Sequence, residues 1–126
     1  MKKIIIAFGL YYLLLGIIIL LAPIYFYQNT PGVSMMGPYN AHFIRDVSFA
    51  FIASGAGLLL GAVQSLKSTI IVAALWPFMH ALFHFTIWYR RDFVVDSITL
   101  SDFFAVVIPG LLVLLLATRF NGGRHV

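Results

Sequence analysis

Four long runs of apolar residues, separated by short polar segments, organise the chain. They extend over about residues 4–24, 41–63, 69–89 and 100–118. A hydrocarbon core of about 30 Å is crossed by about 20 helical residues, which is close to the length of each run. Backbone groups in lipid must be hydrogen-bonded within the protein, and the runs are too long and too evenly apolar for barrel strands. The pattern therefore predicts an all-α protein, a four-transmembrane-helix bundle in a single domain of residues 1–126.

Basic residues in the connecting segments predict how the helices are oriented. One side of the bundle carries Lys2, Lys3, Lys67, Arg119 and Arg124. The other side carries Arg45, Arg90 and Arg91. Because Lys and Arg are enriched in cytoplasmic segments, we expect a multi-pass protein of the cell inner (plasma) membrane with both termini in the cytoplasm. The four acidic residues, all aspartates, then lie toward the outer side.

Composition supports a lipid environment and excludes several classes of site. Hydrophobic residues make up 62% of the chain and charged residues 10%, which is outside the range of soluble proteins. The net charge of +4 does not follow a basic stripe interleaved with exposed aromatics, so we expect no nucleic-acid partner. With no cysteine, disulfides, thiolate ligands and iron–sulfur clusters are excluded. The apolar run after Lys2-Lys3 exceeds a signal-peptide core and lacks a cleavage pattern, which predicts a membrane span.

Small residues and prolines predict where helices approach and bend. In the second run, one helical face carries Ala50, Ala53, Ser54, Gly57 and Gly61. Such a face allows close packing against a helix of the same chain or of another copy, and we expect a homo-oligomer. Leu58 is predicted to face lipid. Pro77 and the pair Pro109-Gly110 each remove a backbone hydrogen bond and should open their helices locally.

Histidines in the second and third runs form the main candidate site. His80 and His84 are four residues apart and share a helix face, and His42 and Asp46 have the same spacing. Both pairs fall in the outer half of the bundle. Together they offer three imidazoles and one carboxylate, a four-ligand set suited to Zn, Cu, Ni or Fe.

Three other interpretations of the histidines remain open. Haem could be held by His42 with one of the other two, because neighbours stacked on one helix cannot bind the same iron from both sides. A quinone could contact His80 and His84 directly. Alternatively, these two side chains form a structural network with Asp46, Ser48, water or a carbonyl freed by the proline.

Arg45 and Asp102 have simpler explanations beside their functional ones. Arg45 is predicted to extend its guanidinium to the membrane interface, or else, with His42, to bind an anionic cofactor group such as a phosphate, a sulfur oxyanion or a carboxylate. Thr99-Leu-Ser-Asp102 matches the Thr-x-x-acid pattern of a capping box. Asp102 is therefore predicted to close the start of the fourth helix.

Residues 40–55 carry a family resemblance. Their sequence, Asn-Ala-His-Phe-Ile-Arg-Asp-Val-Ser-Phe-Ala-Phe-Ile-Ala-Ser-Gly, places an arginine before a glycine-containing small-residue helix. With the four-span layout, it resembles the second-helix region of small DoxX-like four-helix membrane proteins. The resemblance implies association with membrane redox systems such as thiosulfate:quinone oxidoreductase, whose DoxD subunit belongs to that group. It does not extend to His80 and His84.

These patterns lead to three functional hypotheses, and none identifies a catalytic residue. The first is a protein whose His/Asp/Arg site binds a metal or redox cofactor in quinone-linked electron transfer. The second is a non-catalytic subunit that assembles or stabilises a larger membrane complex through the small-residue face. The third is a small oligomeric transporter, which is disfavoured because four spans enclose little volume.

Overall fold

Four long helical segments form the protein in the computed structural model, which describes residues 1–122 and contains no strand within them. Three are the α-helices α1 (Lys2–Leu21), α3 (Ala41–Gln64) and α4 (Lys67–Arg90). The fourth is continuous through α5 (Ser97–Asp102), the π-helical turn η2 (Phe103–Val107) and α6 (Ile108–Arg119). All four are long and apolar enough to cross a membrane. The predicted all-α four-helix architecture is confirmed.

Two helix boundaries differ from the prediction for local reasons. The first long helix ends at Leu21, and the short helix α2 (Pro23–Asn29) follows, because a proline favours the first turn of a new helix. The 3₁₀ turn η1 (Val33–Met36) completes this connection. The last segment begins at Ser97 because the carboxylate of Asp96 accepts a hydrogen bond from the Thr99 N–H at 3.0 Å. The predicted cap at Asp102 was therefore wrong.

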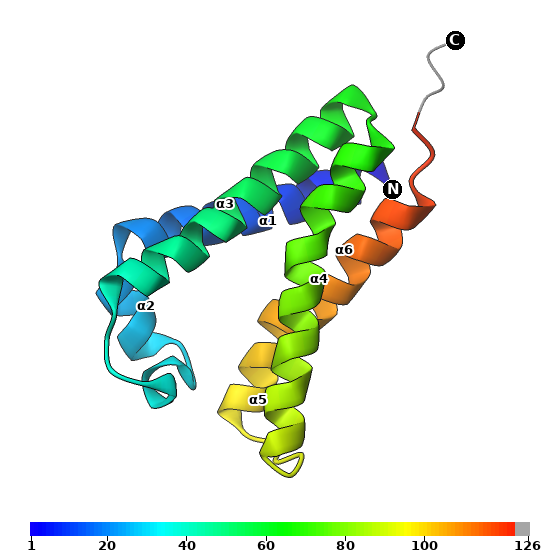
Figure 1. Ribbon diagram of the computed structural model, residues 1–126. Coiled ribbons are helices and arrows are strands. Elements are labelled where there is room, and N and C mark those ends of the chain that lie inside the picture. Colours follow the sequence, from blue (N-terminus) through cyan, green and yellow to red (C-terminus); the bar gives the residue numbers. More distant parts are fainter. Residues whose placement is uncertain (123–126) are drawn as a thin grey trace.

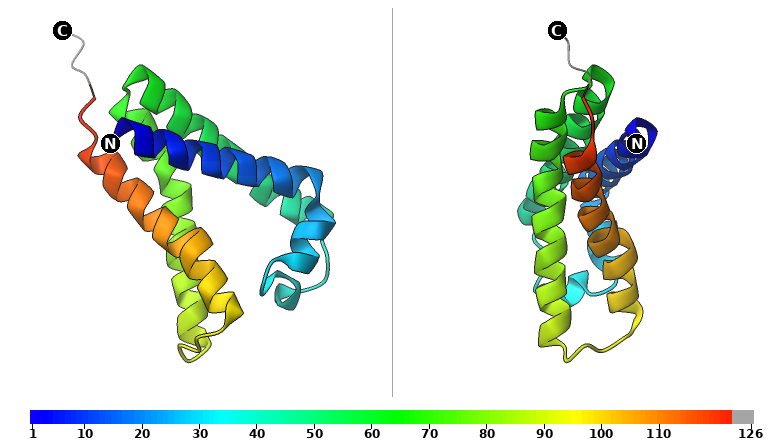
Figure 2. Two further views of the ribbon diagram at one scale, coloured as in Figure 1. Left: turned by 180° about the vertical axis from the view of Figure 1, so that it is seen from behind. Right: turned by 90° about the vertical axis from the view of Figure 1, so that its right-hand side faces the viewer.

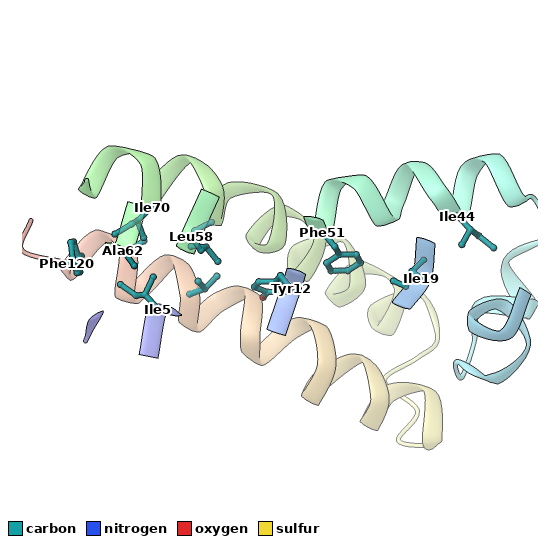
Figure 3. Close-up of a cluster of buried hydrophobic side chains, with 12 residues drawn as sticks. Ile5, Tyr12, Ile19, Ile44, Phe51, Leu58, Ala62, Ile70 and Phe120 are labelled. Carbon is teal, nitrogen blue, oxygen red and sulfur yellow. The ribbon is translucent and has the colours of Figure 1, made fainter. Parts of the chain in front are cut away.

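The four segments form two antiparallel pairs arranged as a V (Figure 1). The pairs are α1–α3 and α4–α6, and Figure 2 shows them meeting near the chain's N-terminus and separating toward the opposite end. Much of the buried core lies where they meet, with Ile5, Leu58, Ala62 and Ile70 close together (Figure 3). Tyr12 and Phe51 lie farther along, at the point where the arms begin to separate.

The α1–α3 arm is held by glycines that bring two backbones together. A side chain at Gly55 would collide with the Leu13 nitrogen and the Gly9 carbonyl of α1. A Cβ at Gly16 would lie 2.8 Å from the backbone of α3. Lipid offers no hydrophobic force between helices, so close van der Waals contact of this kind stabilises the arm.

The predicted small-residue face of α3 turns toward α4 of the same chain. A Cβ at Gly57 would lie 2.8 Å from the Ala73 Cβ, and one at Gly61 would lie 3.0 Å from the Ile70 nitrogen. Close packing is thus present at the two glycines, whereas Ala50 and Ala53 border an open groove. Leu58 is fully buried, so its predicted lipid-facing position was wrong.

Pro77 of α4 and Pro109 of α6 lie where the backbones of these two helices touch, close to the π-helical turn. Pro109 has no N–H to donate to the carbonyl of Ala105, four residues earlier, and the Tyr11 hydroxyl of α1 donates to that carbonyl at 2.7 Å. Ala105 lies within the π-helical turn η2, which ends two residues before Pro109. A side chain at Gly110 would collide with the Pro77 carbonyl of α4, so the two proline regions pack together.

Candidate functional site

Aromatic rings connect the two arms where they separate. The Tyr12 and Phe51 rings stack with centroids 6.0 Å apart, and Phe51 meets Trp76 of α4 edge to face at 4.6 Å. Trp76 in turn stacks on His80, with centroids 4.8 Å apart and an interplanar angle of 14°. The series therefore leads from the core to the first of the candidate histidines.

His80, His84 and Asp102 continue this series as a polar cluster. The two imidazole centroids are 4.6 Å apart, as expected for neighbours at i and i+4 on α4. His84 Nδ1 lies 3.0 Å from Asp102 Oδ2, and the two side chains are 20% and 16% exposed. The contact is at ion-pair distance but does not meet the geometry of a hydrogen bond.

The orphaned polar atoms of the described chain belong to this same series of rings. Within residues 1–122, the buried side-chain polar atoms without a hydrogen-bond partner are the Tyr12 hydroxyl and His84 Nδ1. An unpaired buried atom such as the Tyr12 hydroxyl costs about 1–3 kcal/mol, whereas His84 Nδ1 keeps its ion-pair contact with Asp102. Polar groups inside a membrane are a default indication of function. The region is therefore chemically unlike the rest of the core.

Local structure explains why Asp102 reaches α4. Asp96 caps α5, and Asp102 follows within two turns as the last residue of that helix, just before the π-helical turn. Arg91 forms an ion pair with Asp96 and so ties the end of α4 to the start of α5. The Arg91 hydrogen bond, followed by that of the Thr99 N–H, lowers the pKa of Asp96 to about 2, and the same contact raises the pKa of Arg91.

The other predicted pair lies on the opposite arm. His42 Nε2 is 3.4 Å from Asp46 Oδ2 near the start of α3, and both side chains are exposed, at 89% and 57%. Arg45 is exposed beside them. Because the arms diverge toward this end (Figure 1), matching depth does not bring His42 or Asp46 to the histidines of α4.

The predicted four-ligand set of His42, Asp46, His80 and His84 is consequently not assembled. Residues 1–122 contain no group of three or more His, Cys, Asp or Glu side chains able to hold a metal ion. The same separation keeps His42 from sharing a haem iron with a histidine of α4. The structure instead joins His80 and His84 to Asp102.

Sequence reasoning missed the aromatic part of the site and the role of Asp102. Trp76, His80 and His84 are spaced at i, i+4 and i+8, so their shared face was detectable from the sequence. Asp96-Ser-Ile-Thr99 also offered a competing capping residue, which would have freed Asp102 for another partner.

The chain was also compared with models of known protein families, with characterised proteins and with solved structures, and nothing matches it in any of the three comparisons. The DoxX-like resemblance therefore stays a prediction.

Proposed function

We propose that this protein binds a lipid-soluble ligand with a hydrogen-bonding headgroup, of the quinone or quinol class, at His80, His84 and Asp102. The observation that carries the proposal is the half-buried contact of His84 with Asp102, with a second imidazole 4.6 Å away. Ionisable groups are costly within a membrane and typically serve a ligand or proton pathway.

The chemistry of the His84–Asp102 pair suits such a headgroup. A carboxylate beside Nδ1 favours the tautomer with its proton on that nitrogen, which leaves Nε2 as an acceptor for a quinol hydroxyl. When the imidazole is protonated, Nε2 instead donates to a quinone carbonyl. His80 supplies a second imidazole beside His84. The two histidines, with Asp102, can therefore bind either the quinone or the quinol form of the headgroup.

The surroundings favour an organic headgroup over a metal ion. Two histidines on one helix and a single carboxylate provide fewer well-directed ligands than the four that a structural transition-metal site requires. Trp76, whose ring stacks on His80, adds an aromatic group to the surroundings. Planar aromatic groups pack well against such a ring, as ligand pockets combine apolar walls with few polar groups.

We further propose that the cluster lies in the outer half of the inner membrane, with both termini in the cytoplasm. The N-terminus, the α3–α4 connection and the end of α6 lie at the joined end of the V (Figure 1). Lys2, Lys3, Lys67 and Arg119 belong to that end, whereas Arg45, Arg90 and Arg91 belong to the other. This distribution supports the orientation by the positive-inside rule.

Tryptophan fluorescence tests the binding site directly. Trp88→Phe leaves Trp76 as the only tryptophan of the chain, next to His80. Titration with a short-chain benzoquinone or naphthoquinone in detergent should give saturable quenching. In this background, His80→Gln and His84→Ala should each weaken binding about tenfold, the equivalent of one lost hydrogen bond of about 1.4 kcal/mol.

His42→Gln is the matched control, because it removes an exposed histidine of the other arm. It should bind the quinone as the Trp88→Phe protein does. Thermal unfolding of each variant shows that the fold is retained. Unsaturable quenching, or equal affinity for all histidine variants, would rule out the proposed site.

A further inference from the structure

An open groove of about 590 Å³ runs along the line where α3 and α4 cross. No Lys, Arg, Asp, Glu or His lines it, so it is suited to the interior of the membrane. The α3 side is formed by small residues, Ala50, Ala53, Ser54 and Gly57. The α4 side is formed by Ser68, Thr69, Val72, Ala73 and Trp76. Small side chains of this kind allow another helix to approach closely.

Ser54 distinguishes this groove from an ordinary lipid-facing depression. The residue is only 5% exposed and lines the groove. Ser48, Thr86 and Thr118 each donate their hydroxyl to a carbonyl three residues earlier. Ser54 makes no such bond within residues 1–122. Its hydroxyl is therefore accessible at the groove without a hydrogen-bond partner in the described residues, and an acyl chain cannot supply one.

We propose that the occupant is α3 of a second copy of this chain, forming a two-fold dimer across Ser54. A hydroxyl is both a donor and an acceptor, so the same residue from an identical helix satisfies it. A two-fold interface pairs identical surfaces, and it places a residue near the axis opposite itself. Two copies inserted in the same orientation have this axis along the membrane normal, with their α3 helices running parallel.

The dimer also accounts for the alanines that leave the groove open. Gly57 and Gly61 already contact α4 within the chain, whereas Ala50 and Ala53 border the open groove between α3 and α4. A second α3 laid along these alanines would bring two backbones close enough for van der Waals packing and a hydrogen bond between the two Ser54 side chains.

Cysteine cross-linking in membranes tests this contact, because the natural chain contains no cysteine. Ser54→Cys, a nearly isosteric change, should give a disulfide-linked dimer on mild oxidation. Leu14→Cys is the control on α1, at an exposed position 56% accessible. Cross-linking of Ser54→Cys that is absent, or no stronger than that of Leu14→Cys, would overturn the proposal.

A second measurement uses a matched pair of larger side chains. Ala53→Leu fills the groove, whereas Ala56→Leu makes the same change at an exposed α3 position that does not line it. The mass of the detergent-solubilised protein should fall from dimer to monomer for Ala53→Leu alone. A monomeric wild-type protein both in detergent and in lipid vesicles would show that only lipid occupies the groove, and the proposal would fail.

Discussion

The two arms of the V use opposite means to hold two helices together. In the α1–α3 arm, glycines bring the backbones into contact, and its ionisable pair, His42 with Asp46, remains exposed at the far end. The α4–α6 arm contains both intrahelical proline positions, the π-helical turn and the half-buried contact of His84 with Asp102. Regular, closely packed helices form a scaffold, whereas irregular helix is frequent at functional sites. This difference supports the proposed site in the α4–α6 arm, with the α1–α3 arm as its scaffold.

The largest expected loss of stability comes from disrupting the glycine contact between α1 and α3. Gly55→Leu forces a side chain into the backbone of α1 at Leu13 and Gly9, where nothing flexible can move aside. We expect destabilisation of about 3 kcal/mol or more, at the upper end of overpacking effects. Denaturant unfolding in detergent measures it. Ala56→Leu, on the exposed face of α3, should be nearly neutral, and equal stability of the two variants would refute the packing argument.

A smaller effect is expected from the ionisable pair of the other arm. Asp102→Ala leaves half-buried His84 without its carboxylate, which should cost about 1–3 kcal/mol. Asp46→Ala breaks a corresponding contact of His42 that is exposed, and should cost less than about 1 kcal/mol. Thermal unfolding of both variants provides the comparison. If Asp46→Ala were the more damaging change, the roles of the two arms would be reversed.

The sequence predicted the helices of both arms, but not which carboxylate lies beside His84. Hydropathy and length identified all four helical segments, because every lipid-exposed backbone must form helix wherever the chain crosses. The i, i+4 spacing of His80 and His84 correctly placed their rings together. Their partner could not be obtained in this way, because spacing along one helix carries no information about the angle between arms. The angle between the arms keeps Asp46 of α3 away from His84. The carboxylate beside His84 is instead that of Asp102, in the same arm.

The next effect concerns the hydrogen bond that joins the arms. Tyr11→Phe removes the donor to the Ala105 carbonyl and should cost about 1 kcal/mol, the usual net value of such a bond. In a Pro109→Ala background, the restored N–H can serve that carbonyl, so the same tyrosine change should cost less. A double-mutant cycle of unfolding free energies measures the difference. Identical costs in both backgrounds would show that the proline does not create the need for this bond.

The smallest expected effect is a loss of stability in acid through the Arg91–Asp96 ion pair, which connects α4 to α5. The Arg91 hydrogen bond holds the pKa of Asp96 at about 2, below its ordinary 3.8. Because the folded-state pKa is depressed, the ionised carboxylate stabilises the fold above about pH 4, and this contribution is lost as the pH falls toward 2. Asp96→Asn should therefore be less stable than wild type at pH 6, with a difference that shrinks toward pH 2 in thermal unfolding. In an Arg91→Gln background, which removes the main cause of the shift, the same asparagine change should show a weaker pH dependence. A difference that stays constant from pH 6 to pH 2 would show that the ion pair does not stabilise this end of the arm.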